Sequence, residues 1–291
     1  MAEITAKMVK ELREATGAGM MECKKALTEA EGDFEKAVDV LRTHGLAKAA
    51  KKAGRATNEG RVNVAVCKKD ATKGAVVEVN CETDFVALTD KFQDYCDTFT
   101  RAVVHGNPAT VDELLESEYE GEKVGDTLTE AIHIIGENMQ ISNFKRLEID
   151  GTGALVPYIH MNGRIGVLVG FTFNNEATAT DERFLAMGKD VAMQIAATNP
   201  VSLDKDSVPE DIREHEFEIY KAQAAESGKP ENIQEKIATG RMEKFYKESC
   251  LTEQAFVKDP DQSVNQYTAA VAKQLGTTIE IVDFTRFMLG E

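Results

Sequence analysis

Two stretches of this chain repeat one pattern, a β-branched strand followed by a helix, and this repeat limits the fold more than any other feature. Residues 74–79 and 166–171 are the two apolar strands. Helices are expected to begin near Asp90 and Glu182. Each strand also has an upstream partner, joined to it by a glycine-bearing turn as hairpins require; these partners are residues 62–66 and 154–159. Segregated hairpins and helices favour an α+β fold with two related subdomains over a doubly wound parallel sheet.

Residues 5–45 are predicted to form three short helices. Thr5 can cap the first helix, with Ile4 and Val9 as a hydrophobic staple. The glycines expected to mark helix ends are Gly17, Gly32 and Gly45. The apolar residues that recur at helical spacing, and so predict a common core, are Val9, Leu12, Leu27, Phe34, Val38 and Leu41. A bundle of under ~50 residues is marginal alone, which suits a binding module joined to the rest by a connecting segment at 49–54.

A charged helical hairpin is predicted between Pro209 and Ser249. The segment Ser227-Gly228-Lys229-Pro230 would break it, because glycine ends helices and proline starts them. The hairpin would project as an arm, either for structure alone or for dimerisation or partner contact. A last helix at 264–275 and a strand at 278–287 would return to the core. The expected domains are residues 1–54, 55–148, 149–207 together with 250–291, and the hairpin at 208–249.

Charge and motif content narrow the function classes. The net charge of −16, from 34 basic and 50 acidic residues, opposes non-specific nucleic-acid binding. A basic cluster (Lys48, Lys51, Lys52 and Arg55) follows the nearly neutral first 54 residues, and a solvated helix end or linker is the better interpretation of it. The 5 cysteines form no C-x-x-C pair, which disfavours a zinc site or a disulfide framework. No phosphate-binding loop or nucleophile elbow is present. We therefore expect that the chain is not an enzyme and that it has no catalytic residues, no bound metal and no cofactor.

Localisation follows from two further features. No apolar run reaches the roughly 18 residues that a membrane span needs. The first residues, beginning Met1-Ala2-Glu3, lack the apolar region of a secretion signal. A cytoplasmic protein is expected.

Two segments contain residues that packing of a hydrophobic core does not fully explain. Adjacent helical residues point about 100° apart, so one of Met20 and Met21 is expected at the surface, where methionine suits an adaptable binding surface. The alternative, that both lie in the core, fits the pattern equally well. In Thr83-Asp84-Phe85-Val86, spacing favours a helix cap with Phe85 and Val86 buried beneath it. The functional alternative places Phe85 at a loop tip as an apolar wedge, with Asp84 as a hydrogen-bond acceptor or cation competitor.

Several motifs together resemble the bacterial elongation factor Ts family, the guanine-nucleotide exchange factors for elongation factor Tu. They lie in order along nearly the whole chain: residues 12–27, 78–87, 164–169, 227–230 and 240–242. The resemblance implies a ubiquitin-associated-type three-helix N-terminal domain, two core subdomains and an inserted coiled-coil hairpin. It also departs in two places, since the family commonly has an earlier arginine pair in the stretch 139–146 and continues into a further helix beyond the position of Gly290-Glu291.

The resemblance also implies where the partner, elongation factor Tu, is contacted. Thr83-Asp84-Phe85-Val86 corresponds to the segment that enters the partner near its bound magnesium. Arg13, Met20 and Met21 fall in the stretch that grips the GTPase domain. His160 falls where a core histidine approaches the partner. The hairpin at 208–249 is in addition a candidate surface for a homodimer or a 2:2 complex.

Overall fold

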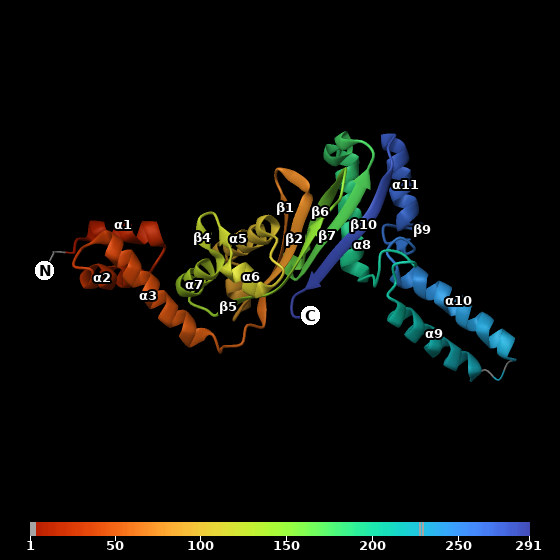
Figure 1. The fold of residues 1–291 in the computed structure, drawn as a ribbon, viewed down its shortest axis with the longest axis horizontal. Coiled ribbons are helices and arrows are strands. Elements are labelled where there is room, and N and C mark those ends of the chain that lie inside the picture. The colour runs from red at the N-terminus through yellow and green to blue at the C-terminus, as the bar shows by residue number, and fades with distance from the viewer. Residues whose placement is uncertain (1–3, 227, 229) are drawn as a thin grey trace.

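The computed structural model describes residues 4–226, 228 and 230–291. Figure 1 shows three parts along its long axis: a group of N-terminal helices, a central body that contains the sheets, and a helical hairpin at the far end. Helices and small antiparallel sheets occupy separate stretches of the chain. The α+β class predicted from the repeated hairpins is confirmed.

The N-terminal helices are α1 (Ala6–Thr16), α2 (Met20–Glu29) and α3 (Phe34–Lys52). Thr5 caps α1 as predicted, accepting a hydrogen bond from the Met8 amide at 3.3 Å. Two predictions are wrong. The helix α3 runs through Gly45 to Lys52, and Gly45 is buried against His133 of another helix. Phe34 begins α3 and is exposed rather than in the small core.

The first sheet has the strand order β1-β2-β5 and is antiparallel, with β1 (Glu59–Cys67), β2 (Asp70–Cys81) and β5 (Met139–Glu148). Its outer face is covered by helices α5 (Asp90–Gly106) and α7 (Val124–Ile135), with the shorter α6 (Val111–Glu116) and the ribbon β3 (Glu118–Tyr119) and β4 (Glu122–Lys123) beside them. Lys68 and Lys69 make the turn between β1 and β2, so the prediction that this turn contains a glycine is wrong.

The second sheet repeats this plan in the order β10-β7-β6, with β6 (Gly153–His160), β7 (Ile165–Phe173) and β10 (Ile279–Met288). Helices α8 (Glu182–Thr198) and α11 (Val264–Leu275) pack on its outer face, and α11 spans the predicted residues. The short elements are η1 (Met161–Gly163), η2 (Glu176–Thr180), β8 (Ala255–Phe256) and β9 (Asp259–Ser263). Here the turn does contain the predicted glycine, Gly163, at φ 97°.

The inner faces of the two sheets pack on each other, so each sheet is buried on both sides. The residues that fill this interface are Val62, Val76, Leu147, Ile149, Leu155 and Leu168. Burial on both faces explains why the central strands are continuously apolar instead of alternating. Gly166 permits the close approach, since an added Cβ there would lie 2.4 Å from Val62 Cγ1.

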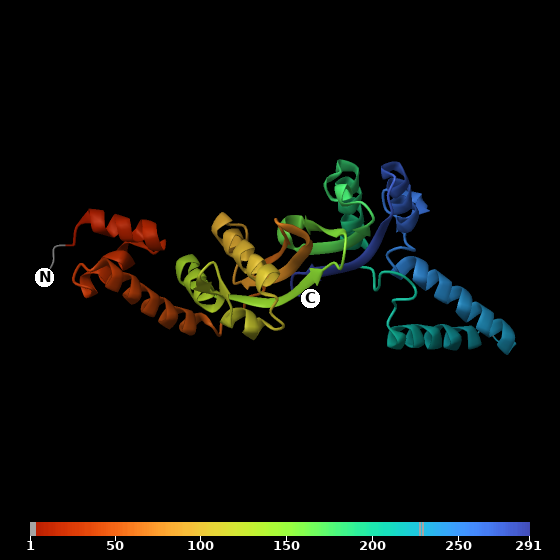
Figure 2. The same cartoon turned by 45° about the horizontal axis from the view of Figure 1, so that its top comes forward.

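The hairpin consists of α9 (Glu210–Ala225) and α10 (Glu231–Ser249), and both views show it extending away from the sheets (Figures 1 and 2). Within the predicted break, Gly228 has φ 64° and Pro230 stands at the N-cap of α10, while Ser227 and Lys229 lie outside the described residues. Its described helical residues bury little, and the fully buried ones are Ala224, Ala238 and Met242. Among the residues described, no helix is long and apolar enough to cross a membrane.

Candidate functional site

Directly after β2, the chain forms a single helical turn, α4 (Asp84–Ala87). Thr83 is its N-cap, and the Thr83 hydroxyl accepts from the Val86 amide at 3.4 Å, so the predicted cap is confirmed. The expectation that Phe85 is buried is wrong, because its side chain is 80% exposed. Only Ala87 of this turn is buried. The cap therefore holds an outward-facing phenylalanine.

Two carboxylates fix this turn to the first sheet, and we call Glu82 and Glu137 the carboxylate clasp. One Glu137 oxygen accepts from the amides of Glu82 and Thr83, each at 3.0 Å, and the other accepts from the Thr83 hydroxyl at 2.6 Å. In return, Glu82 accepts from the Asn138 amide at 2.6 Å. The clasp joins the paired ends of β2 and β5. Charged acceptors make these among the stronger hydrogen bonds.

Arg55 and Asn138 extend the clasp toward the N-terminal helices. The Arg55 guanidinium lies 3.3 Å from Glu82, and its backbone carbonyl accepts from the Asn138 side chain at 2.9 Å. The Asn138 amide, and then the Arg55 guanidinium, lower the pKa of Glu82. The carboxylate therefore stays ionised at neutral pH. Sequence reasoning missed Glu137 and the role of Glu82; their signal was an acidic residue next to each of two paired strand ends.

Phe85 and Leu88 together form an apolar surface that we call the α4 tip. They stand three residues apart, one helical turn, and Leu88 is 57% exposed. Asp84 precedes them and is exposed as well. Within the described ranges, no hydrogen bond or ion pair engages the Asp84 carboxylate, so it is free to meet a partner.

His160 lies at the same end of the sheets as α4. Its Nδ1 lies 2.9 Å from the Tyr158 hydroxyl, at the end of β6. The turn that follows packs against Arg61 of β1, close to Glu59, which pairs with Cys81 just before α4. Met161 in this turn is 61% exposed and was not predicted as a site residue. The structure thus brings His160 and Thr83-Asp84-Phe85-Val86 to one end of the body.

The remaining predicted residues lie on the N-terminal helices, apart from the α4 tip. Met20 and Met21 are 58% and 67% exposed, so the alternative that both are core residues is wrong. Arg13 on α1 is also exposed. Glu22, in the same turn as the two methionines, forms an ion pair with Lys48 of α3. The basic cluster is thus partly engaged in contacts rather than simply solvated. The candidate site consists of two surfaces, one on the helices and one on the sheets.

Comparison with known proteins gives a consistent result. The family model described as Elongation factor TS matches residues 82–291. The protein named Elongation factor Ts from Trichlorobacter lovleyi is 50% identical over 291 residues, covering 99% of this chain and 93% of that protein. Its namesakes from Clostridium kluyveri and from Clostridium botulinum (strain Okra) are 48% and 47% identical, with the same coverage.

Proposed function

This chain belongs to the elongation factor Ts family, and we propose that it acts in the cytoplasm as the guanine-nucleotide exchange factor for elongation factor Tu during translation elongation. The observation that carries the proposal is Phe85, which is 80% exposed on a turn held by the carboxylate clasp. An exposed aromatic side chain on a fixed turn has no packing role in this chain. A partner that covers this turn would bury it, and buried aromatic side chains are common anchors of protein interfaces.

The proposed mechanism acts on the partner's magnesium site. Mg²⁺ bridges nucleotide phosphates and protein side chains, so displacing it weakens the hold on GDP. The α4 tip supplies the apolar wedge, and the exposed Asp84 supplies an acceptor that competes for the cation or its ligands. The clasp reduces the ordering entropy that a mobile loop would lose on binding.

The wedge is not sufficient alone. Exchange follows from linkage, because a factor that weakens GDP binding must itself bind less well when GDP is present. Accelerating release about 10⁴-fold requires on the order of 5.5 kcal/mol of differential binding. Burying one phenylalanine supplies only about 1.5–3 kcal/mol. We assign the remainder to Arg13, Met20 and Met21 on the module 1–54 and to His160 on the core.

The test is GDP release from elongation factor Tu, measured with a fluorescent nucleotide. Phe85→Ala should slow the stimulated release about 10- to 100-fold, as expected from the lost burial energy. A Met20→Ala/Met21→Ala double variant should weaken partner binding. Leu185→Ala is the matched control, since Leu185 is an exposed apolar residue on α8 that lies outside the site. Full exchange activity in both test variants would contradict the mechanism.

A passive binding module is the rival function, and GDP distinguishes the two. Exchange requires that partner binding weaken when GDP is added. A passive scaffold would bind equally with and without GDP in a titration. Few residues of the hairpin helices are buried, so their surface is available for a second role, a homodimer or a 2:2 complex through residues 208–249. Sedimentation of the free chain and of the complex would reveal either assembly.

A further inference from the structure

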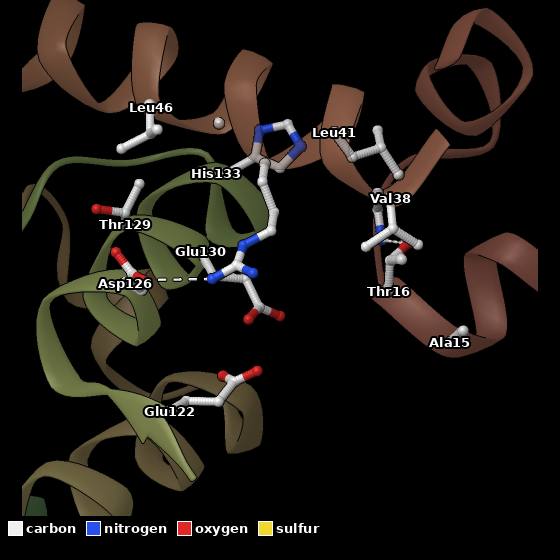
Figure 3. Close-up of a pocket in the computed structure, with 13 residues that line it drawn as sticks. Ala15, Thr16, Val38, Leu41, Leu46, Glu122, Asp126, Thr129, Glu130 and His133 are labelled. Carbon is white, nitrogen blue, oxygen red and sulfur yellow. Dashed lines mark hydrogen bonds and ion pairs between the residues drawn. The ribbon is translucent and has the colours of Figure 1, made fainter. Parts of the chain in front are cut away.

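A cavity of about 400 Å³ lies between the N-terminal helices and α7. Figure 3 shows its two unlike walls, with Val38 and Leu41 of α3 on one side and the carboxylates of Glu122 and Glu130 on the other. Leu46 extends the apolar wall along α3, and Asp126 adds a third carboxylate from α7. Cavities of this size are typical of small-molecule sites. Nothing in the proposed exchange mechanism uses this cavity.

The cavity has an excess of negative charge. Its three carboxylates face one cation, the Arg42 guanidinium, which lies 3.3 Å from Asp126. Across the ranges described, no hydrogen bond or ion pair engages the carboxylate of Glu122 or of Glu130. Partial desolvation, and then the neighbouring Glu122 carboxylate, raise the pKa of Glu130, although the residue remains at the surface. The two acids repel each other, and the nearby cations Lys91 and Arg42 offset this repulsion only in part.

His133 gives an independent indication of a ligand. It lines the cavity from α7, and its side chain is only 6% exposed. Within the described part of the chain, neither ring nitrogen makes a hydrogen bond, and the Glu22 carboxylate lies 3.3 Å from Nε2 without the geometry for one. Burial, and then Lys48, Lys52 and His44, lower the pKa of His133. The ring is therefore neutral at pH 7 and offers an acceptor to an N–H donor.

We propose that this cavity binds a small aliphatic diamine, two ammonium groups joined by a short methylene chain. Among the residues that line the cavity, three carboxylates against one guanidinium leave an excess of negative charge, which suits a ligand with two ammonium groups. The methylenes would pack on Val38, Leu41 and Leu46, a wall that offers nothing to a hydrated metal ion. The ammonium groups would donate to the Glu122 and Glu130 carboxylates and to the unprotonated nitrogen of His133, none of which accepts a hydrogen bond within the described residues. Anionic ligands are excluded by the same charge.

A bound diamine would also connect two parts of the molecule. The apolar wall belongs to the N-terminal helices, whereas the acidic wall belongs to β4 and α7. A ligand that contacts both walls stabilises the arrangement in which they face each other. It therefore favours one orientation of α2, which carries Met20 and Met21, relative to the sheets. This binding does not depend on the proposed exchange function.

The test uses the full chain and putrescine as the probe. Titration calorimetry should show saturable binding, and methyl NMR signals of Val38, Leu41 and Leu46 should shift with the same affinity. Glu122→Gln and Glu130→Gln should each weaken binding at least about ten-fold, the range expected for a lost charged hydrogen bond. The matched control is Glu243→Gln on α10, another exposed helical glutamate, which should bind as the parent does.

The corresponding uncharged diol serves as the second probe and should not bind. Equal binding of the diol would show that the apolar wall alone selects the ligand. Unchanged affinity in both test variants, or a lack of saturable putrescine binding, would overturn the proposal. Both glutamates are at the surface, so neither substitution removes a core side chain.

Discussion

Replacing Glu137 by alanine tests whether the carboxylate clasp positions the α4 tip. The substitution removes the acceptor for the Glu82 and Thr83 amides and for the Thr83 hydroxyl. It leaves Phe85 and the Thr83 cap of α4 in place. We expect α4 to keep its local hydrogen bonds but to lose its fixed attachment to β5.

The magnitude follows from these three contacts. A hydrogen bond to a charged group contributes about 1.5–3 kcal/mol. Three bonds on one carboxylate are not additive, and water replaces part of the loss because Glu137 is half-buried. We therefore expect about 2–4 kcal/mol less resistance to local opening, which corresponds to roughly 30- to 700-fold faster exchange of protected amides.

Hydrogen exchange at the Glu82 and Thr83 amides measures this opening, because Glu137 is the acceptor of both. Glu148→Ala is the matched control, since Glu148 stands at the other end of β5 and contacts Arg146 and Lys73 instead. Glu137→Gln keeps the shape without the charge and should fall between the parent and Glu137→Ala. Unchanged protection of the Glu82 and Thr83 amides in Glu137→Ala would refute the reasoning.

Three further predictions concern the body of the molecule. Burial holds the pKa of His133 below its usual 6.5, so below pH 6.5 the unfolded chain takes up a proton that the folded protein resists. The contribution of His133 to the free energy of unfolding is therefore complete above pH 6.5 and is lost as the pH falls below it. Urea unfolding of the parent and of His133→Gln on both sides of pH 6.5 should show a difference that depends on pH. Burial raises the pKa of Cys81 to about 12, so a thiol reagent should label the half-buried Cys67 first, as mass spectrometry would report. Gly166→Ala should destabilise by about 1–3 kcal/mol in chemical denaturation, and Val62→Ala should recover part of that loss because it removes the clashing methyl.

Local sequence signals predicted the elements that depend on local chemistry. The β-branched runs at 74–79 and 166–171 are strands, and the glycine–proline break separates α9 from α10. The length of α3 could not be predicted in this way. A glycine often ends a helix, but here α3 continues through Gly45, which packs against His133, a residue far away in the sequence. A contact of that range leaves no periodic signal near Gly45.

The exposure of Phe85 was unpredictable for a related reason. The Thr83 cap satisfies an amide of α4 from within the segment, so it forms equally well above a core or at a surface. Glu137 decides between these two positions, because it holds the segment by hydrogen bonds from Thr83. The aromatic ring of Phe85 is then not needed to attach the segment to the core. Phe85 and Leu88 on α4 and Met20 and Met21 at the start of α2 are all exposed apolar side chains. Because their own chain does not bury them, a protein partner is the most direct physical explanation for their presence.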